Sequence, residues 1–135
     1  MKLVVDSNII IAALIKDSVT RKLLTHLDAE LFTIKITEQE IKKYKEELCK
    51  KAGIDEQTFS LITEKLYDKM IILDDKLIST KIQEAKKIMD HIDAKDTPFI
   101  AAALTIKAEI WSDDQHFQKQ NKVKVYKTSE LLMLL

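Results

Sequence analysis

The sequence predicts an α/β sandwich, with helices on both faces of a mostly parallel β-sheet. Segments with strand character and segments with helical periodicity largely alternate along the 135-residue chain, and a helical crossover is the usual link between parallel strands. The first strand, at residues 3–5, is a continuous apolar run, which is typical of a strand buried on both faces. Because the chain has one Gly and one Pro, element boundaries must be read from helix caps and from changes of hydrophobic period.

The first third of the chain contains two predicted strands. The strand at 3–5 leads into an apolar helix at 9–15, and a second helix is expected to begin at Ser18. Residues 31–36 alternate with period two and include β-branched side chains, which predicts the second strand.

A helical arm is predicted after the second strand. Thr37 opens a helix with Ile41, Tyr44 and Leu48 on one face, and Asp55 opens another. The other predicted elements are a strand at 70–73, helices at 79–89 and 97–107, strands at 109–111 and 123–126, and a helix at 129–135. The apolar run at 131–135 either packs in the core or is buried in a dimer interface, and the sequence does not decide between the two.

Composition limits the function classes. A chain of 135 residues with 46% hydrophobic content is predicted to form a single domain over residues 1–135. Basic and acidic residues number 22 each, so the formal net charge is zero. The chain as a whole therefore has no electrostatic attraction to nucleic acid or to an anionic membrane. The single Cys49 excludes an intramolecular disulfide and a zinc knuckle. No apolar run is long enough to span a membrane and Asp6 interrupts any signal-peptide core, so a soluble, cytoplasmic protein is expected.

Four acids, Asp6, Glu40, Asp96 and Asp114, lie at the ends of predicted strands or at the starts of predicted helices. The carboxyl ends of parallel strands meet at one edge of a sheet, so acids that are distant in sequence can converge there. We therefore expect these four side chains to form one site.

Each acid also has a simpler interpretation, which is a helix cap for Asp6, Glu40 and Asp96 and a solvated loop position for Asp114. Asp6 precedes an apolar helix and could cap it, although Ser7 or Asn8 would serve equally well. Asp96 is weaker as a cap, because Pro98 favours the first helical position and makes Thr97 the expected cap. The nearby helix N-terminus would then help to keep Asp96 ionised.

Glu40 has the most specific alternative role. Thr37 and Glu40 have the spacing of a capping box, in which Glu40 would bind the backbone N–H of Thr37. Glu38 and Glu40 lie on opposite flanks of the apolar stripe, so one of them can face a crevice, and periodicity does not choose between them.

Asp113 and Asp114 follow the fourth predicted strand and complete the acidic set. Two carboxylates about 4 Å apart repel each other by about 4 kcal/mol at an effective dielectric constant of about 20, so such a cluster should bind protons or a cation. Oxygen ligands favour Mg²⁺ or Mn²⁺, which activate water against a phosphodiester, and a second metal is possible roughly 4 Å away.

The histidines and lysines receive simpler interpretations. His91, Asp93 and Asp96 form a conceivable mixed ligand set, but His91 and His26 are expected at surface or satisfied core positions. His116 is a minor candidate for proton transfer because it is two residues from Asp114. The lysine-rich stretches at 42–45, 50–51 and 86–87 are expected to be solvated helix faces.

Four short motifs, VVDSN, TEQEI, KDTPFIAAAL and WSDDQHF, follow one another along nearly the whole chain. Together they resemble the PIN domain, a family of metal-dependent ribonucleases. The first family acid and its polar neighbour match Asp6 and Asn8. The second family acid directly precedes an aliphatic residue. Glu40 directly precedes Ile41, so the resemblance selects Glu40 over Glu38.

The remaining family positions match the C-terminal half. The third acid opens the alanine-rich helix and matches Asp96, and the fourth matches Asp114, two residues after Ser112, while Asp113 occupies a variable position. The resemblance implies that Asp6, Asp96 and Asp114 hold metal. It implies that Glu40 binds metal or orients water, and that Asn8 and Ser112 support the site.

The resemblance also implies fold, activity and partners. It implies a five-stranded parallel sheet of order 3-2-1-4-5, one or two Mg²⁺ or Mn²⁺ ions, and cleavage of single-stranded RNA. Many small PIN domains, including VapC-like toxins, dimerise and are held inactive by an antitoxin protein, and this sequence shows neither partner. The RNA cleaved and the metal used in the cell also stay open.

Two rival functions remain to be separated. A response-regulator receiver is also a small α/β domain, and Asp74, Ser112 and Lys127 could be placed in its roles, but its paired acids after strand one are missing. A metal-binding or RNA-binding scaffold with little turnover shares the acidic site, so activity alone distinguishes it from a nuclease.

Overall fold

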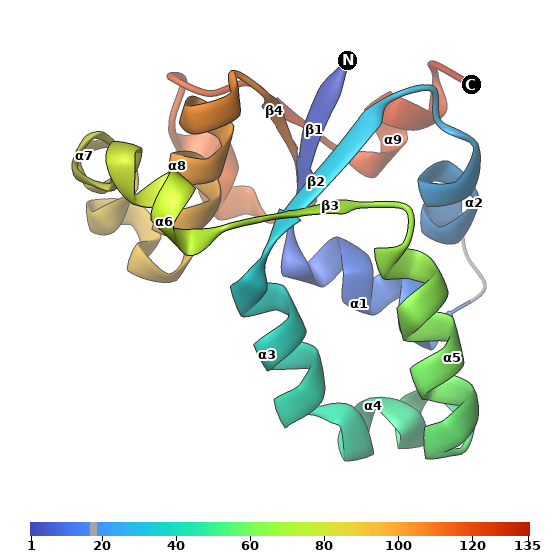
Figure 1. The fold of residues 1–135 in the computed structure, drawn as a ribbon. Coiled ribbons are helices and arrows are strands. Elements are labelled where there is room, and N and C mark those ends of the chain that lie inside the picture. The colour runs from blue at the N-terminus through green and yellow to red at the C-terminus, as the bar shows by residue number, and fades with distance from the viewer. Residues whose placement is uncertain (17–18) are drawn as a thin grey trace.

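The computed structural model describes residues 1–16 and 19–135 and contains a five-stranded sheet in the order β3-β2-β1-β4-β5 (Figure 1). All four strand pairs are parallel. The strands are β1 (Lys2–Val5), β2 (Glu30–Ile34), β3 (Ile71–Leu73), β4 (Glu109–Trp111) and β5 (Val125–Tyr126). The predicted α/β class and strand order are confirmed.

Helices cover both faces of this sheet. The α-helices are α1 (Ser7–Ile15), α2 (Val19–His26), α3 (Lys35–Lys43), α4 (Lys45–Ala52), α5 (Glu56–Tyr67), α6 (Asp75–Ile78), α7 (Ile82–Asp93), α8 (Thr97–Ile106) and α9 (Thr128–Leu132). Short 3₁₀ turns occur at η1 (Ser79–Lys81), η2 (Ala94–Asp96) and η3 (Gln115–Lys119). None of the helices in the described ranges is long and apolar enough to cross a membrane.

Two hydrophobic cores lie on opposite faces of β1. Leu3 and Val5 pack with residues of α1, α2, α5 and α9, whereas Val4 packs with residues of α7 and α8. Successive side chains of a strand point to opposite faces, so this short apolar run supplies both cores. Figure 1 shows α1, α2, α5 and α9 on one side of the sheet and α6, α7 and α8 on the other.

The carboxyl ends of β1 and β4 lie side by side at the centre of the sheet. Val5 pairs with Trp111, and the backbone N–H of Asp6 donates to the Trp111 carbonyl at 3.1 Å. Trp111 is fully buried, and its indole N–H donates to the Thr128 hydroxyl at 3.1 Å. The residues that follow these two strands are therefore held next to each other.

The junction between β2 and α3 differs from the prediction. The strand ends at Ile34 instead of residue 36, and α3 begins at Lys35. Thr37 therefore lies inside the helix, where its hydroxyl donates to the Ile34 carbonyl at 2.9 Å. The predicted capping box of Thr37 and Glu40 is not formed, because the N-cap residue is Ile34.

The arm after β2 consists of α3, α4 and α5, which project together from one end of the sheet (Figure 1). The predicted single helix with Tyr44 on its apolar face is wrong. Tyr44 separates α3 from α4 at φ −103° and ψ 15°, and it is 45% exposed. Gly53 ends α4 at φ +70°, a left-handed conformation that favours glycine. Asp55 caps α5 as predicted, because its carboxylate accepts from the Thr58 N–H at 2.7 Å.

Several other boundaries also shift. The predicted start of the second helix at Ser18 lies outside the described residues, and α2 is described from Val19. The predicted helix at 79–89 is divided between η1 and α7, and α7 continues to Asp93. The final helix ends at Leu132, with Leu131 fully buried in the core and the four residues after it exposed.

Candidate metal centre

A cavity of about 250 Å³ lies where β1 and β4 end, and all four predicted acids line it. Its lining residues are Asp6, Ser7, Asn8, Glu40, Asp93, Lys95, Asp96, Phe99 and Asp114. The parallel sheet thus brings together acids from four separate parts of the chain. A larger groove of about 560 Å³ runs along the arm, but its lining is mainly apolar and lacks these four acids, so we place the candidate centre in the smaller cavity.

Ser112 joins the first and last acids. Its hydroxyl donates to Asp6 Oδ2 at 2.7 Å, and the backbone N–H of Asp114 donates to Ser112 Oγ at 3.0 Å. Asp6 and Ser112 are both buried. Although Asp6 occupies the N-cap position of α1, its side chain makes no cap bond to the described residues of that helix. The cap interpretation therefore does not account for Asp6, whose orientation is set by Ser112.

Burial and neighbouring charge both disfavour ionisation of two of the acids. Burial raises the pKa of Asp6 to about 6, with a further contribution from Asp114, while the hydrogen bond from Ser112 opposes the rise. Burial likewise raises the pKa of Asp96 to about 7, and Asp6, Asp93 and Asp114 add to it. Such a cluster is relieved by protons or by a bound cation.

Asp96 has an unpartnered oxygen in this cavity. The residue is 8% exposed, and Asp96 Oδ2 has no hydrogen-bond partner among the described residues. A buried acceptor without a donor costs free energy, and coordination of a cation by this oxygen would offset that cost.

The predicted cap role of Thr97 is wrong, because Thr97 is the first residue of α8 and its hydroxyl donates to Asp90 Oδ1 at 2.6 Å.

The structure separates the two glutamates that periodicity leaves equivalent. Glu40 lines the acidic cavity, whereas Glu38 lines the larger groove of the arm. They lie two residues apart on α3 and so point in different directions from the helix axis. The structure therefore favours Glu40 over Glu38 as the glutamate of the acidic cavity, and this observation is independent of the family resemblance.

The supporting residues divide between the cavity and the surface. Asn8 is exposed and lines the cavity. Asp113, predicted to support the site, is not among the residues that line the cavity. Its two carboxylate oxygens accept from the Thr128 backbone N–H at 2.7 Å and from the Thr128 hydroxyl at 2.6 Å, so it fixes the start of α9.

Asp93, Lys95 and His116 are functional candidates that the sequence interpretation missed or undervalued. Asp93 and Lys95 line the cavity, and His116 Nδ1 lies 3.0 Å from Asp93 Oδ2. The spacing of Asp93 and Asp96 was a usable signal, because residues three apart eclipse each other in a 3₁₀ turn. His91 is exposed, so the imidazole near these acids is that of His116.

The sheet order excludes the receiver interpretation. A receiver-type sheet has the order 2-1-3-4-5, which places strand three beside strand one, but here β3 is an edge strand next to β2. The Asp74 carboxylate accepts from the Lys76 backbone N–H at 3.3 Å at the start of α6 and does not line the acidic cavity.

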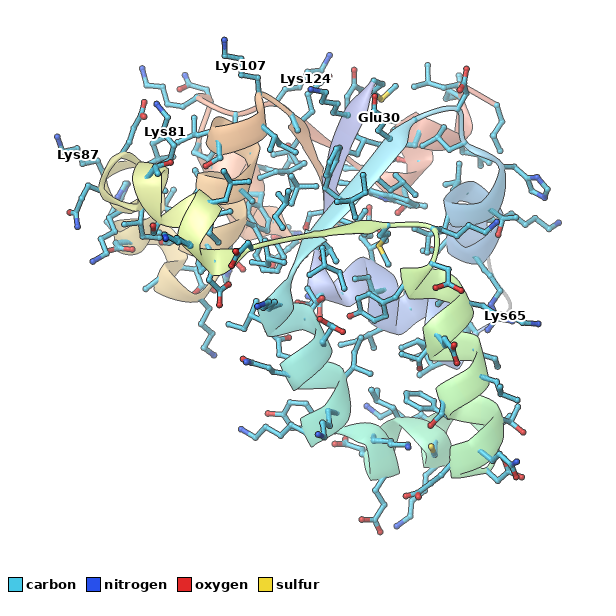
Figure 2. The ribbon with its side chains drawn as sticks, viewed as in Figure 1. Glu30, Lys65, Lys81, Lys87, Lys107 and Lys124 are labelled. Carbon is cyan, nitrogen blue, oxygen red and sulfur yellow. The ribbon has the colours of Figure 1, made fainter. Side chains whose placement is uncertain are left out.

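Most of the lysines in the predicted solvated runs are exposed, as expected from their positions on helix faces. Figure 2 shows Lys87 pointing outward from α7 and Lys65 pointing outward from α5. Lys95 is the lysine that lines the acidic cavity in the described part of the chain.

Comparisons with known proteins point to one family. The PIN domain family profile matches residues 4–135. Among solved structures, the fold is similar to a chain in the crystal structure of VapBC2 from Rickettsia felis bound to a DNA fragment from their promoter. The TM-score is 0.72 at 13% identity, and the alignment covers 94% of this chain and 98% of that one. No curated protein sequence matches the chain.

Proposed function

This chain belongs to the PIN domain family, and on that premise we propose that it is a divalent-metal-dependent endoribonuclease that cleaves single-stranded RNA. PIN domains are generally metal-dependent nucleases. The observation that carries the proposal is the convergence of Asp6, Glu40, Asp96 and Asp114 on one cavity, in which Asp96 Oδ2 has no hydrogen-bond partner among the described residues.

The donor set fits Mg²⁺ or Mn²⁺. Carboxylate oxygens are the ligands that these hard cations prefer, and Asp6, Asp96 and Asp114 would hold the ion. When bound, the cation supplies Lewis-acid activation of water and neutralises charge on the phosphodiester. Ser112 holds Asp6 Oδ2 in place through its hydroxyl, and the exposed Asn8 would support the rim of the cavity.

Glu40 and Lys95 act on the reactants in this proposal. Glu40 lines the cavity from α3, and in this proposal it would orient the attacking water and accept its proton. Lys95 contacts a phosphate oxygen of the RNA at the rim. A flexible single strand can bend one phosphodiester into a cavity of about 250 Å³ more easily than a duplex can.

The proposed partners follow the same family. We propose that an antitoxin protein restrains the nuclease, that the nuclease forms a homodimer, and that it works in the cytoplasm. The similarity in fold to a chain of the VapBC2 structure supports the partner proposal.

Cleavage of a mixed single-stranded RNA pool tests the function, with Glu40→Gln compared to Glu38→Gln. The wild type should cleave with Mn²⁺ or Mg²⁺ and stop in EDTA. Glu40→Gln removes a carboxylate from the cavity and should lose most of this activity, whereas Glu38→Gln makes the same change in the groove of the arm and should keep it. Gel analysis of end-labelled RNA gives the rates.

Two outcomes would contradict the proposal. Cleavage that continues in EDTA would show that the activity does not need a metal. Metal binding without cleavage of any RNA in the pool would identify the protein as a binding scaffold.

A further inference from the structure

We infer that Asp93, Asp96 and His116 form a second cation position in which an imidazole nitrogen acts as a ligand beside carboxylates. One ligand atom from each of the three residues lies within 4.8 Å of the other two. This inference extends the proposed function, because Asp96 would be shared with the cation held by Asp6 and Asp114.

The contacts of His116 Nδ1 carry the inference. This nitrogen lies 3.0 Å from Asp93 Oδ2, 3.6 Å from Asp114 Oδ1 and 3.8 Å from Asp96 Oδ2. Nevertheless, His116 Nδ1 and Asp96 Oδ2 are both shielded from solvent and have no hydrogen-bond partner among the described residues. A cation at this position would accept the lone pair of His116 Nδ1 together with oxygens of Asp93 and Asp96, and both unpartnered atoms would then have a partner.

Other contacts hold the ligands in place. Asp93 Oδ1 accepts from the Lys95 backbone N–H at 3.1 Å, which leaves Asp93 Oδ2 free to face His116. The backbone N–H of His116 donates to Asp114 Oδ1 at 2.9 Å and fixes the start of η3. Hydrogen bonds that orient ligands in this way are a common property of protein metal sites.

The nitrogen ligand predicts metal selectivity. Imidazole is a good ligand for transition metals, whereas Mg²⁺ prefers oxygen donors only. The second position should therefore favour Mn²⁺ over Mg²⁺. An ion there and an ion among Asp6, Asp96 and Asp114 would share Asp96, so the two positions would be adjacent.

The test is pulsed electron paramagnetic resonance of Mn²⁺ bound to the full chain. The wild type should show coupling of Mn²⁺ to a histidine ¹⁴N, and protein labelled with ¹⁵N-histidine should show the ¹⁵N pattern instead. His116→Asn should remove the coupling and weaken Mn²⁺ binding at this position by about tenfold or more. The matched control His91→Asn changes an exposed histidine and should keep both properties.

The isotope comparison uses unmutated protein, so it does not depend on the folding of a variant. Mn²⁺ bound without histidine coupling, or coupling that survives in His116→Asn, would overturn the inference and leave the proposed nuclease intact. Histidine coupling in a protein that cleaves no RNA would support the second position and contradict the proposed function. A protein that binds no Mn²⁺ would overturn both.

Discussion

An Asp6→Asn variant is expected to remain folded and to lose metal-dependent RNA cleavage by roughly 100-fold or more, because changes to groups that merely support metal ligands already cost about 10–100-fold. The fold should survive because the amide oxygen of Asn can still accept the hydrogen bond that Ser112 Oγ donates to Asp6 Oδ2. The negative charge that would hold the cation is lost, while the shape of the site is kept. Initial rates of RNA cleavage in Mn²⁺ measure the effect.

Asp113→Asn is the matched control for this prediction. It removes one carboxylate from the same strand end, but Asp113 binds Thr128 at the start of α9 and does not line the cavity. Its cleavage rate should stay close to that of the wild type. An Asp6→Asn variant that cleaves as fast as this control would show that Asp6 is not part of the active centre.

The metal-free protein is expected to lose stability as the pH rises from about 4 to about 8. Asp6 and Asp96 have folded-state pKa values of about 6 and about 7, both raised from 3.8 mainly by burial. Below pH 3.8 each carboxyl is protonated in both the folded and the unfolded state. Between 3.8 and these raised values the folded state binds more protons, so stability falls as the pH increases.

The size of the effect is large for a small domain. The rise in the Asp6 pKa from 3.8 to about 6 corresponds to about 3 kcal/mol of stability, or roughly 10 °C in the melting temperature. A hundredfold excess of Mn²⁺ over its Kd should restore about 3 kcal/mol at the higher pH. Thermal unfolding in EDTA and in Mn²⁺ at the two pH values measures both effects.

The Asp6→Asn variant isolates the contribution of the Asp6 carboxyl to the pH dependence of stability. It cannot ionise at this position, so its metal-free form should be more stable than the wild type at about pH 8 and lose less stability over the same pH interval. A wild type that becomes more stable as the pH rises in EDTA would contradict the raised pKa values and the crowding of the acids.

The fold was predictable because its strands leave strong signals. The apolar run at 3–5 and the alternation that begins at residue 31 both correspond to strands of the sheet. The end of β2 was missed because Ile36 continues the apolar pattern into α3. The break at Tyr44 was missed because neither Gly nor Pro marks it, and tertiary packing decides where that helix ends.

The candidate site was predictable where topology alone determines it. Asp6 directly follows β1, and Asp114 lies in the loop just after β4, which pairs with β1, so a parallel sheet brings the two acids close together. The choice between Asp113 and Asp114 depends on the direction of each side chain in a loop, which the sequence pattern does not define. His116 meets Asp93 only because the end of α7 packs against η3, and that contact has no local signal in the sequence.

An anomalous difference map from crystals soaked in Mn²⁺ tests the central claim most directly. The account predicts a Mn²⁺ peak inside the cavity, coordinated by carboxylate oxygens of Asp6, Asp96 and Asp114. A cavity without a Mn²⁺ peak, at a concentration that supports RNA cleavage, would contradict the assignment of these acids as the metal centre.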